Sequence, residues 1–194
     1  MQLLGSNSSP FVRRIRVWAY RNAISLDFKN LDIFAKADRE IMIHCNPARK
    51  IPILIDDAQT ITDSNVIIRY LLEKNQQPRF NWQQENLLTV INACNDSLVE
   101  LLLCQRSGFN TGDDKLFFNL QNERITETLT YLNTQTTESV FKSCEYLNIS
   151  LYCLLDWIYF RELTDFSHLT HLTDFYEQFA QQPAIQLTDP RHQK

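Results

Sequence analysis

The sequence of 194 residues is poor in glycine, with only Gly5, Gly108 and Gly112. Loops that wrap around nucleotide phosphates need several glycines at fixed short spacings, because the backbone must approach the phosphate closely. Three scattered glycines do not supply such a loop. The shortage therefore excludes Walker, protein-kinase and Rossmann nucleotide sites.

Cysteine pairs of the kind that hold a metal or build a disulfide framework are also missing. The five cysteines are an odd number without a Cys-x-x-Cys motif, and most lie in apolar helical surroundings. We expect them to be buried thiols: Cys45, Cys94, Cys104, Cys144 and Cys153. His168 and His171 can place both rings on one helical face, but no third zinc ligand is evident. The sequence predicts no metal site.

The sequence has no basic excess and no long apolar run. It carries 19 Lys+Arg against 23 Asp+Glu, which argues against a nucleic-acid partner because such binding relies on a basic surface. The most apolar stretch, "SLVELLLC", is interrupted by Glu100 and is shorter than the roughly 20 residues that span a bilayer. The first residues lack the features of a secretory signal. We therefore expect a cytoplasmic protein without nucleic-acid or membrane partners.

Charge divides the chain into two modules. Residues 1–80 carry 12 Lys+Arg against 8 Asp+Glu, whereas residues 81–194 carry 7 against 15. A polar stretch, "NQQPRFNWQQ", separates two periodic segments at this point and contains Pro78. We therefore predict a first domain over residues 1–75, a linker over 76–82 and a second domain over 83–194.

The first module alternates strand and helix patterns. Strands are predicted at 2–6, 23–28, 50–55 and 60–62, the last two forming a hairpin, and helices at 10–21 and 64–75, with a short helix possible at 35–44. In the helix at 10–21, apolar residues recur at helical spacing, Arg13 and Arg14 take other positions, and Asn22 can supply a left-handed stop. The predicted order is βαβαββα.

The second module shows no convincing strand pattern. Apolar residues three or four apart predict helices at 83–105, 113–135, 146–162 and 169–181, joined by short polar loops. We therefore predict an all-α helical bundle. An aromatic group in the third helix, Trp157, Tyr159 and Phe160, can line a pocket for an electrophile, although such groups are more often core.

Three short segments of the first module carry the candidate site. In "NSSPFVRR", Ser9 and Pro10 form a good helix start, where the hydroxyl can cap the helix or bind a ligand near its partial positive charge. In "NPARKIPIL", the bond between Ile51 and Pro52 would be cis in only about 5–6% of cases from sequence statistics alone. In "TITDSNVIIRYL", Asp63 and Ser64 open a helix. They can simply cap it, or they can hold a ligand's ammonium and carboxylate groups.

Taken together, these segments resemble the bacterial glutathione S-transferases over nearly the whole chain. "SPFVRR" looks like the active-site segment of this family, "NPARKIPIL" like its cis-proline loop and "ITDSNVIIRYL" like its γ-glutamyl-binding helix. "LNISLYCLLDWIYFRE" is similar to the central helix of its second domain. The resemblance implies a thioredoxin-like first domain followed by the all-helical domain of the family.

The resemblance also implies roles for single residues. Ser9 would face the glutathione sulfur as the catalytic residue, with Ser8 as the alternative. Ile51 would pair through its backbone with the cysteinyl unit, ahead of a cis Pro52, and Arg49 or Lys50 would meet the glycyl carboxylate. Asp63 and Ser64 would hold the γ-glutamyl end. The implied glutathione-binding set is Ser9, Phe11, Lys50, Ile51, Pro52, Asp63 and Ser64.

The implied activity is conjugation of the glutathione thiolate to an electrophilic small molecule, as in detoxification, by a homodimer that needs no further cofactor. The alternative is a binding or regulatory protein of the same fold without turnover, like the stringent starvation proteins that associate with RNA polymerase. One departure from the family concerns the central helix, which commonly opens with Ser/Thr-x-x-Asp. Here the matching positions are Glu145 and Asn148, and we expect Asn148 to accept a hydrogen bond at the helix start.

Overall fold

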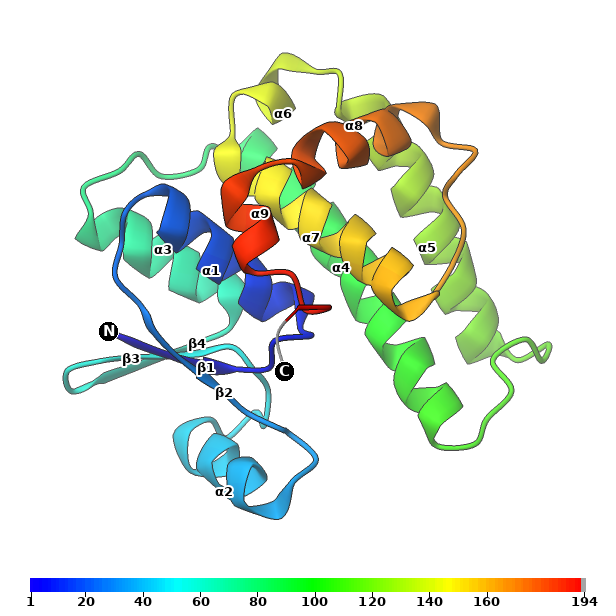
Figure 1. Ribbon diagram of the computed structural model, residues 1–194. Helices are drawn as coiled ribbons and strands as arrows, with labels where there is room; N and C mark the ends of the chain where they lie inside the picture. Colours follow the sequence, from blue (N-terminus) through cyan, green and yellow to red (C-terminus); the bar gives the residue numbers. More distant parts are fainter. Residues whose placement is uncertain (193–194) are drawn as a thin grey trace. The chain divides into compact units, whose positions relative to one another are not determined.

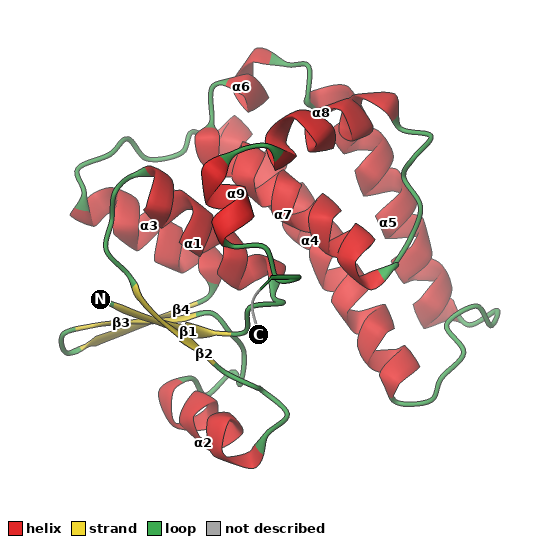
Figure 2. Cartoon of the chain, viewed as in Figure 1, coloured by secondary structure: helices red, strands yellow, loops and turns green. Residues whose placement is uncertain are grey.

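The computed structural model describes residues 1–192, which fall into two compact units (Figure 1). The first unit contains Met1–Arg79 and the described residues from Gln181 onward, and the second contains Phe80–Ala180. The predicted order of a mixed α/β module followed by a helical module is confirmed (Figure 2). The segment from Gln181 differs from the expectation, because it groups with the first unit rather than with the helices that precede it.

The first unit is built on a four-stranded sheet with the order β2-β1-β3-β4. Its strands are β1 (Gln2–Gly5), β2 (Asp27–Asn30), β3 (Ile53–Asp56) and β4 (Gln59–Thr62). β1 runs parallel to β2 and antiparallel to β3, and β3 runs antiparallel to β4. The helices α1 (Pro10–Arg21) and α3 (Ser64–Lys74) lie on one side of this sheet, and α2 (Lys36–Cys45) lies on the other (Figure 1). The predicted βαβαββα order is confirmed.

Buried side chains on both faces explain this layering. Leu4 and Ile53 belong to a core cluster with Leu31 and with Met42 of α2. Successive side chains of a strand point to opposite faces, so the neighbouring Leu3 points to the side of α1 and α3. Leu3 is completely buried there. Both faces of the central strands β1 and β3 are therefore buried, and helices cover both sides of the sheet.

β2 and the end of α1 differ in detail from the prediction. The paired residues of β2 are Asp27–Asn30, although the expected alternation of half-buried and exposed side chains does run from Ile24 to Phe28. The predicted strand at 23–28 therefore shares only Asp27 and Phe28 with β2, which pairs two residues further along the chain. The left-handed residue after α1 is Ala23, with a φ of 54°, and not Asn22. Asn22 stabilises the helix end differently, because its side-chain amide donates to the carbonyl of Trp18.

The second unit consists of helices only, within the described residues. They are α4 (Trp82–Arg106), α5 (Leu116–Gln135), α6 (Ser139–Lys142), α7 (Glu145–Arg161) and α8 (Thr170–Ala180). The four predicted helices are confirmed, and the short α6 was not predicted. α7 is the core helix of the unit, since nearly every residue from Tyr146 to Ile158 is buried. α4 packs against both α5 and α7.

By length and composition alone, α4 would be able to cross a membrane. The apolar stretch around Glu100 is only part of this helix, which was predicted at 83–105. A core helix of a globular protein passes the same test, and 44% of the most apolar window of α4 is buried inside the protein. Its buried residues, among them Leu87, Ile91 and Leu98, belong to the core.

The start of α7 contradicts the expectation for Asn148. Its side-chain amide does not accept a hydrogen bond but donates one to the carbonyl of Phe141 and one to that of Cys144, each at 3.0 Å. Cys144 occupies the N-cap position and makes no cap hydrogen bond with its side chain. Asn148 thus binds two carbonyls of the preceding turn, which also accept backbone amides, so α6 and α7 are joined without the expected capping arrangement.

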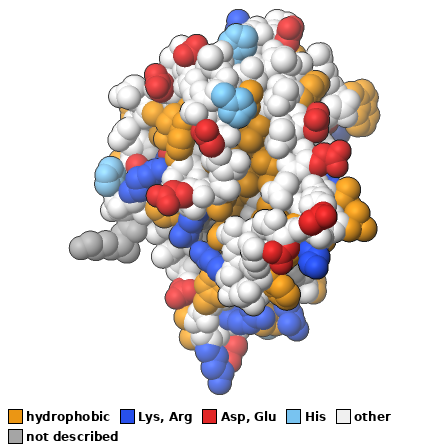
Figure 3. All heavy atoms as spheres, turned by 90° about the vertical axis from the view of Figure 1, so that its right-hand side faces the viewer, with side chains coloured by type: hydrophobic (Ala, Val, Ile, Leu, Met, Phe, Trp, Pro, Cys, Tyr) orange, Lys and Arg blue, Asp and Glu red, His pale blue; other side chains and the backbone are white. Residues whose placement is uncertain are grey.

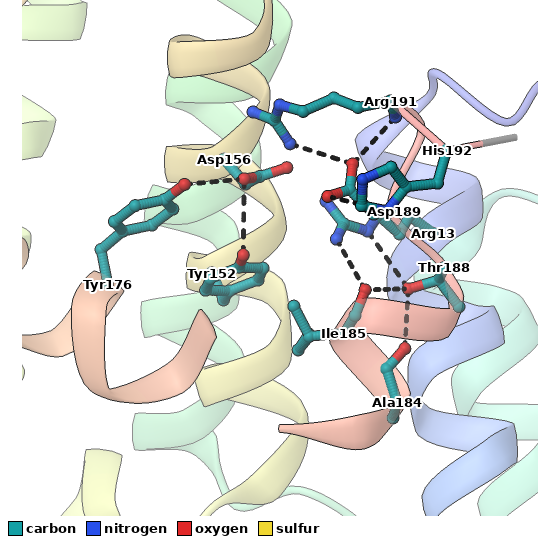
Figure 4. A network of polar contacts seen from close by, with 10 residues as sticks. All are labelled: Arg13, Tyr152, Asp156, Tyr176, Ala184, Ile185, Thr188, Asp189, Arg191 and His192. Carbon is teal, nitrogen blue, oxygen red and sulfur yellow. Dashed lines mark hydrogen bonds and ion pairs between the residues drawn. The ribbon is translucent and has the colours of Figure 1, made fainter. Parts of the chain in front are cut away.

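Aromatic rings connect α7 to α8. Tyr152 stacks on Tyr176 at a centroid distance of 5.3 Å, and Tyr159 contacts both Tyr176 and Phe166. The hydroxyls of Tyr176 and Tyr152 donate to the buried carboxylate of Asp156, at 2.9 and 3.4 Å (Figure 4). Of the residues considered for a ligand pocket, Trp157 is core, whereas Tyr159 is 41% exposed.

Candidate functional site

Ser9 lies at the first turn of α1, as predicted. Its backbone is extended, Pro10 takes the first helical position, and the Ser9 hydroxyl accepts a hydrogen bond from the Val12 amide at 3.4 Å. This is long for a hydrogen bond to a hydroxyl. In the interactions found among the described residues, the hydroxyl accepts but does not donate, so its hydrogen is available to a ligand. Ser9 is half-buried and can be reached from solvent.

Ser8, the alternative to Ser9, is engaged differently. Its hydroxyl lies 3.2 Å from the hydroxyl of Ser6, inside the turn that precedes α1. It also does not occupy the cap position, from which a side chain meets the free amides of the first helical turn. The geometry therefore favours Ser9 over Ser8 as the hydroxyl presented to a ligand.

The bond between Ile51 and Pro52 is cis. The family resemblance implied this isomer, whereas sequence statistics alone favoured the trans isomer. The paired register of β3 begins only at Ile53, so Ile51 lies outside the sheet ladder. Asn46, which is buried, folds the preceding loop: its side chain accepts from the amide of Ala48 and donates to the carbonyl of Lys50. The Asn-Pro pair at the head of "NPARKIPIL" was the available signal for this turn.

Arg49 and Lys50, the two candidates for a carboxylate ligand, are both exposed. Arg49 has a φ of 55°, and its amide donates to the Asn46 carbonyl. The loop therefore presents both basic side chains to solvent and fixes their backbone.

Asp63 and Ser64 form the start of α3. Asp63 is the N-cap, and one carboxylate oxygen, Oδ1, accepts from the amides of Asn65 at 2.7 Å and Val66 at 3.3 Å. Its second oxygen takes part in none of the hydrogen bonds found among the described residues. Asp63 therefore caps the helix, which was the simpler interpretation. Capping uses only one of its two carboxylate oxygens. Ser64 is buried.

Arg14 is a site residue that the sequence analysis missed. It lies on α1, only 1% exposed, and its guanidinium donates to the Ser64 hydroxyl and to the Asn65 side chain. The same guanidinium lies 5.0 Å from the ring centre of Phe11. Helical spacing placed Arg14 away from the apolar residues of α1. No pattern in the sequence shows that its partner would be the start of α3.

Arg13 is also buried, contrary to the expectation from the apolar pattern. Its guanidinium donates to the Ile185 carbonyl at 3.1 Å and to the Thr188 hydroxyl at 3.2 Å (Figure 4). Both acceptors belong to the short helix α9 (Pro183–Leu187) and its C-cap. Arg13 therefore attaches the C-terminal segment to the helix that carries Ser9.

The three predicted segments meet at one end of the sheet. In the register, Leu4 of β1 pairs with Ile53 of β3, and Ile53 pairs with Thr62 of β4. The turn that leads to Ser9 follows β1, Pro52 precedes β3, and Asp63 follows β4. All three segments are thus joined to the sheet at the same end of its strands. Two helix N-termini also lie there, so the region favours anionic ligand groups.

Other reactive groups are not assembled into a second centre. Among residues 1–192 there is no group of three or more His, Cys, Asp or Glu side chains that can hold a metal ion. Burial raises the pKa of Cys94 to about 12, and burial also raises the pKa of the Cys144 thiol. These thiols therefore stay protonated and are poor nucleophiles at neutral pH.

Comparisons with known proteins agree with this geometry. Residues 3–79 match the family model described as "Glutathione S-transferase, N-terminal domain". Over these residues the first unit is similar to glutathione S-transferase N-terminal domains. The chain is 35% identical over 74 residues to glutathione S-transferase U7 of Arabidopsis thaliana, a match that spans 38% of this chain and 32% of the plant protein. It is 25% identical over 190 residues to the uncharacterized GST-like protein YibF of Escherichia coli K12, covering 90% of this chain and 92% of YibF.

Solved structures extend the likeness to both units. A glutathione S-transferase from Methylobacillus flagellatus with glutathione bound aligns with a TM-score of 0.82 and 22% identity, over 96% of this chain and 98% of that one. Another from Methylobacterium radiotolerans, in complex with glutathione sulfonate, aligns with a TM-score of 0.84 and 16% identity, over 100% of this chain and 96% of that one. The chain thus has the glutathione S-transferase fold, a thioredoxin-like domain followed by a helical one, and the predicted resemblance is confirmed.

Proposed function

We propose that the chain binds glutathione in its first unit and transfers the glutathione thiolate to an electrophilic small molecule. The observation that carries this proposal is the Ser9 hydroxyl, which is half-buried at the first turn of α1 and keeps its hydrogen for a ligand. The proposal is supported by similar transferases from M. flagellatus and M. radiotolerans, whose structures hold glutathione and glutathione sulfonate.

The proposed chemistry depends on forming the thiolate. A free cysteine thiol has a pKa of about 8.5, so only a few per cent is ionised near neutral pH. The Ser9 hydroxyl would donate a hydrogen bond to the sulfur, and the N-terminus of α1 would add a favourable potential. Every 1.36 kcal/mol or so of preferential stabilisation of the thiolate lowers its pKa by about one unit. The sulfur then attacks the electrophilic carbon, and the leaving group departs with its electron pair.

The remaining site residues would bind the tripeptide. Ser64, whose hydroxyl accepts from Arg14, would hold the γ-glutamyl carboxylate, while the second oxygen of Asp63 can accept from the ammonium group. The backbone of Ile51, outside the sheet ladder, would pair with the cysteinyl unit. Lys50 or Arg49 would meet the glycyl carboxylate. In this scheme glutathione is a substrate and no further cofactor is required.

The test is the substitution Ser9→Ala, with Ser8→Ala as the matched control. A hydrogen bond to a charged group contributes about 1.5–3 kcal/mol, so kcat should fall roughly tenfold to a hundredfold in Ser9→Ala. The Kd for glutathione, measured by calorimetry, should change little because the other contacts remain. Ser8→Ala should keep most of the activity. Equal losses in the two variants, or an unchanged kcat in Ser9→Ala, would remove Ser9 from the catalytic role.

A melting curve with and without glutathione separates catalysis from binding alone. A ligand that binds only the folded state raises its stability by about 2.7 kcal/mol at a concentration of 100 times the Kd. A raised Tm together with conjugation of a generic electrophile supports the transferase. A raised Tm without conjugation would instead favour the non-catalytic binding protein. The homodimer and the cytoplasmic location implied by the family stay predictions.

A further inference from the structure

The turn that presents Ser9 is fixed at both of its ends. The Ser9 amide donates to the Ser6 carbonyl at 3.0 Å and closes the turn. Before it, Gly5 pairs with Asn30 in the β1–β2 register, and the amide of Leu31 donates to the Gly5 carbonyl. After it, the helix α1 begins at Pro10. The two residues inside the Ser6–Ser9 turn, Asn7 and Ser8, belong neither to the sheet nor to the helix.

Asn7, the first of these two residues, is held by both its backbone and its side chain. Its amide donates to the side-chain oxygen Oδ1 of Asn30 at 2.9 Å. Its own Oδ1 accepts from Nη1 of Arg16 at 2.8 Å. Asn30 is the last residue of β2, and Arg16 lies in the middle of α1. Asn7 therefore joins the turn to one strand and one helix at the same time.

Arg16 is itself held in place. Its guanidinium lies 4.0 Å from the ring centre of Phe28 on β2, which is within the range of a cation–π contact. The side chain is half-buried, so solvent weakens this contact only in part. β2 thus supports Asn7 twice, directly through Asn30 and indirectly through Phe28 and Arg16.

We propose that Asn7, Asn30 and Arg16 are positioning residues for Ser9: they fix the Ser6–Ser9 turn and so hold the Ser9 hydroxyl where it can donate to the glutathione sulfur. This inference rests on the proposed function. Stabilisation of a developing charge depends on a donor that is already in place, and an error of about half an ångström in a site weakens it. None of the three residues needs to touch the tripeptide.

The test is Asn30→Ala, which removes the acceptor of the Asn7 amide. The thiol of bound glutathione is titrated by its ultraviolet thiolate absorbance, and kcat/KM is measured against pH. Loss of this neutral hydrogen bond should lower kcat about two- to tenfold at pH values below the pKa of the thiol. The titration midpoint should rise by up to about one pH unit, with little change in the Kd for glutathione. Asn7→Ala, which keeps the amide but deletes the contact with Arg16, should give a smaller rise.

Two comparisons exclude a purely structural role. Asn30→Asp retains an acceptor oxygen and should restore most of the wild-type midpoint. Asn22→Ala removes an asparagine hydrogen bond at the opposite end of α1 and should lower the Tm without moving the midpoint. If Asn30→Ala lowers the Tm but leaves the midpoint of the thiol unchanged, the positioning role is overturned and the transferase proposal stands. If the wild-type complex shows no lowered thiol pKa, both proposals fail.

Discussion

Gly5 is the residue at which β1 comes closest to α1. A Cβ atom added there would lie 2.4 Å from Cγ2 of Val12, a distance that real Cβ atoms do not reach. Val12 is completely buried, so its side chain cannot swing away into solvent. Gly5 is thus required for close approach of strand and helix directly before the Ser9 turn.

We therefore expect Gly5→Ala to destabilise the protein by about 1–3 kcal/mol, the usual cost of overpacking a core. The free energy of unfolding in urea measures this loss. In a Val12→Ala background the clash partner is gone, so the same change at Gly5 should cost clearly less. Strictly additive losses in the double variant would show that the contact with Val12 is not the cause.

Two buried arginines show that apolar spacing along a helix does not predict the burial of every residue. Arg13 and Arg14 do not follow the apolar spacing of α1 and were assigned to its polar side. Both are nevertheless less than 4% exposed. Each is buried because a specific acceptor reaches it, Thr188 and Ile185 for Arg13 and Ser64 for Arg14. Burying a guanidinium requires hydrogen-bond partners, and these partners are remote in the sequence.

On the scale of elements, a carboxylate ties β3 to α3. Asp56, the last residue of β3, accepts from Lys74 and, at 2.5 Å, from the Tyr70 hydroxyl. The hydrogen bond from Lys74, followed by the one from Tyr70, lowers the pKa of Asp56 below its ordinary value. The same contact with Asp56 raises the pKa values of Tyr70 and Lys74. The ionised carboxylate is therefore the form that holds the two elements together.

This pair of elements gives a stability prediction that depends on pH. Because the folded protein lowers the Asp56 pKa, the contribution is present above the ordinary Asp range and is lost as the pH falls through the lowered value. Asp56→Asn should therefore reduce the free energy of unfolding at neutral pH, and the difference from wild type should shrink towards acid pH. Asp57→Asn, at the exposed neighbouring position, is the control. A difference that does not vary with pH would contradict the charge-based explanation.

Long periodic elements were predicted well, and short ones were not. Periodicity sufficed for α1, α3, α4, α5 and α7, because each has enough turns for its apolar face to repeat. The helices α6 and α9 have only four and five residues, too few for a repeat to show. In β2, only four residues pair with β1, and most of the stretch of alternating half-buried and exposed side chains lies before them. Pairing also requires a neighbouring strand, which the alternation does not reveal.

For the molecule as a whole, the proposed site belongs to the first unit only. Added glutathione should therefore slow amide hydrogen exchange most in residues 9–14 and 51–67, where the proposed contacts lie. Helix α5 should show little change. Mass spectrometry of peptide fragments measures this pattern. Protection that is equal across both units would mean that the ligand stabilises the fold globally rather than through these segments.

The surface of the whole molecule also leaves apolar side chains uncovered. Exposed hydrophobic groups appear among charged ones on the face drawn in Figure 3. In the second unit, several lie close in sequence at the end of α4 and the beginning of α5: Leu103, Phe109, Leu116, Phe117 and Leu120. Single exposed apolar residues are normal in globular proteins.

The sequence by itself determined the order of elements, the division into an α/β and a helical module, and the place of Ser9 at a helix start. These features follow from local spacing and capping, which involve neighbours along the chain. Only the tertiary structure decided that Arg14 meets Ser64, that Arg13 holds the C-terminal segment, and that Asn7 is anchored to Asn30 and Arg16. Such contacts join segments far apart in the chain, so they depend on sheet register and helix packing, which no short stretch of sequence encodes.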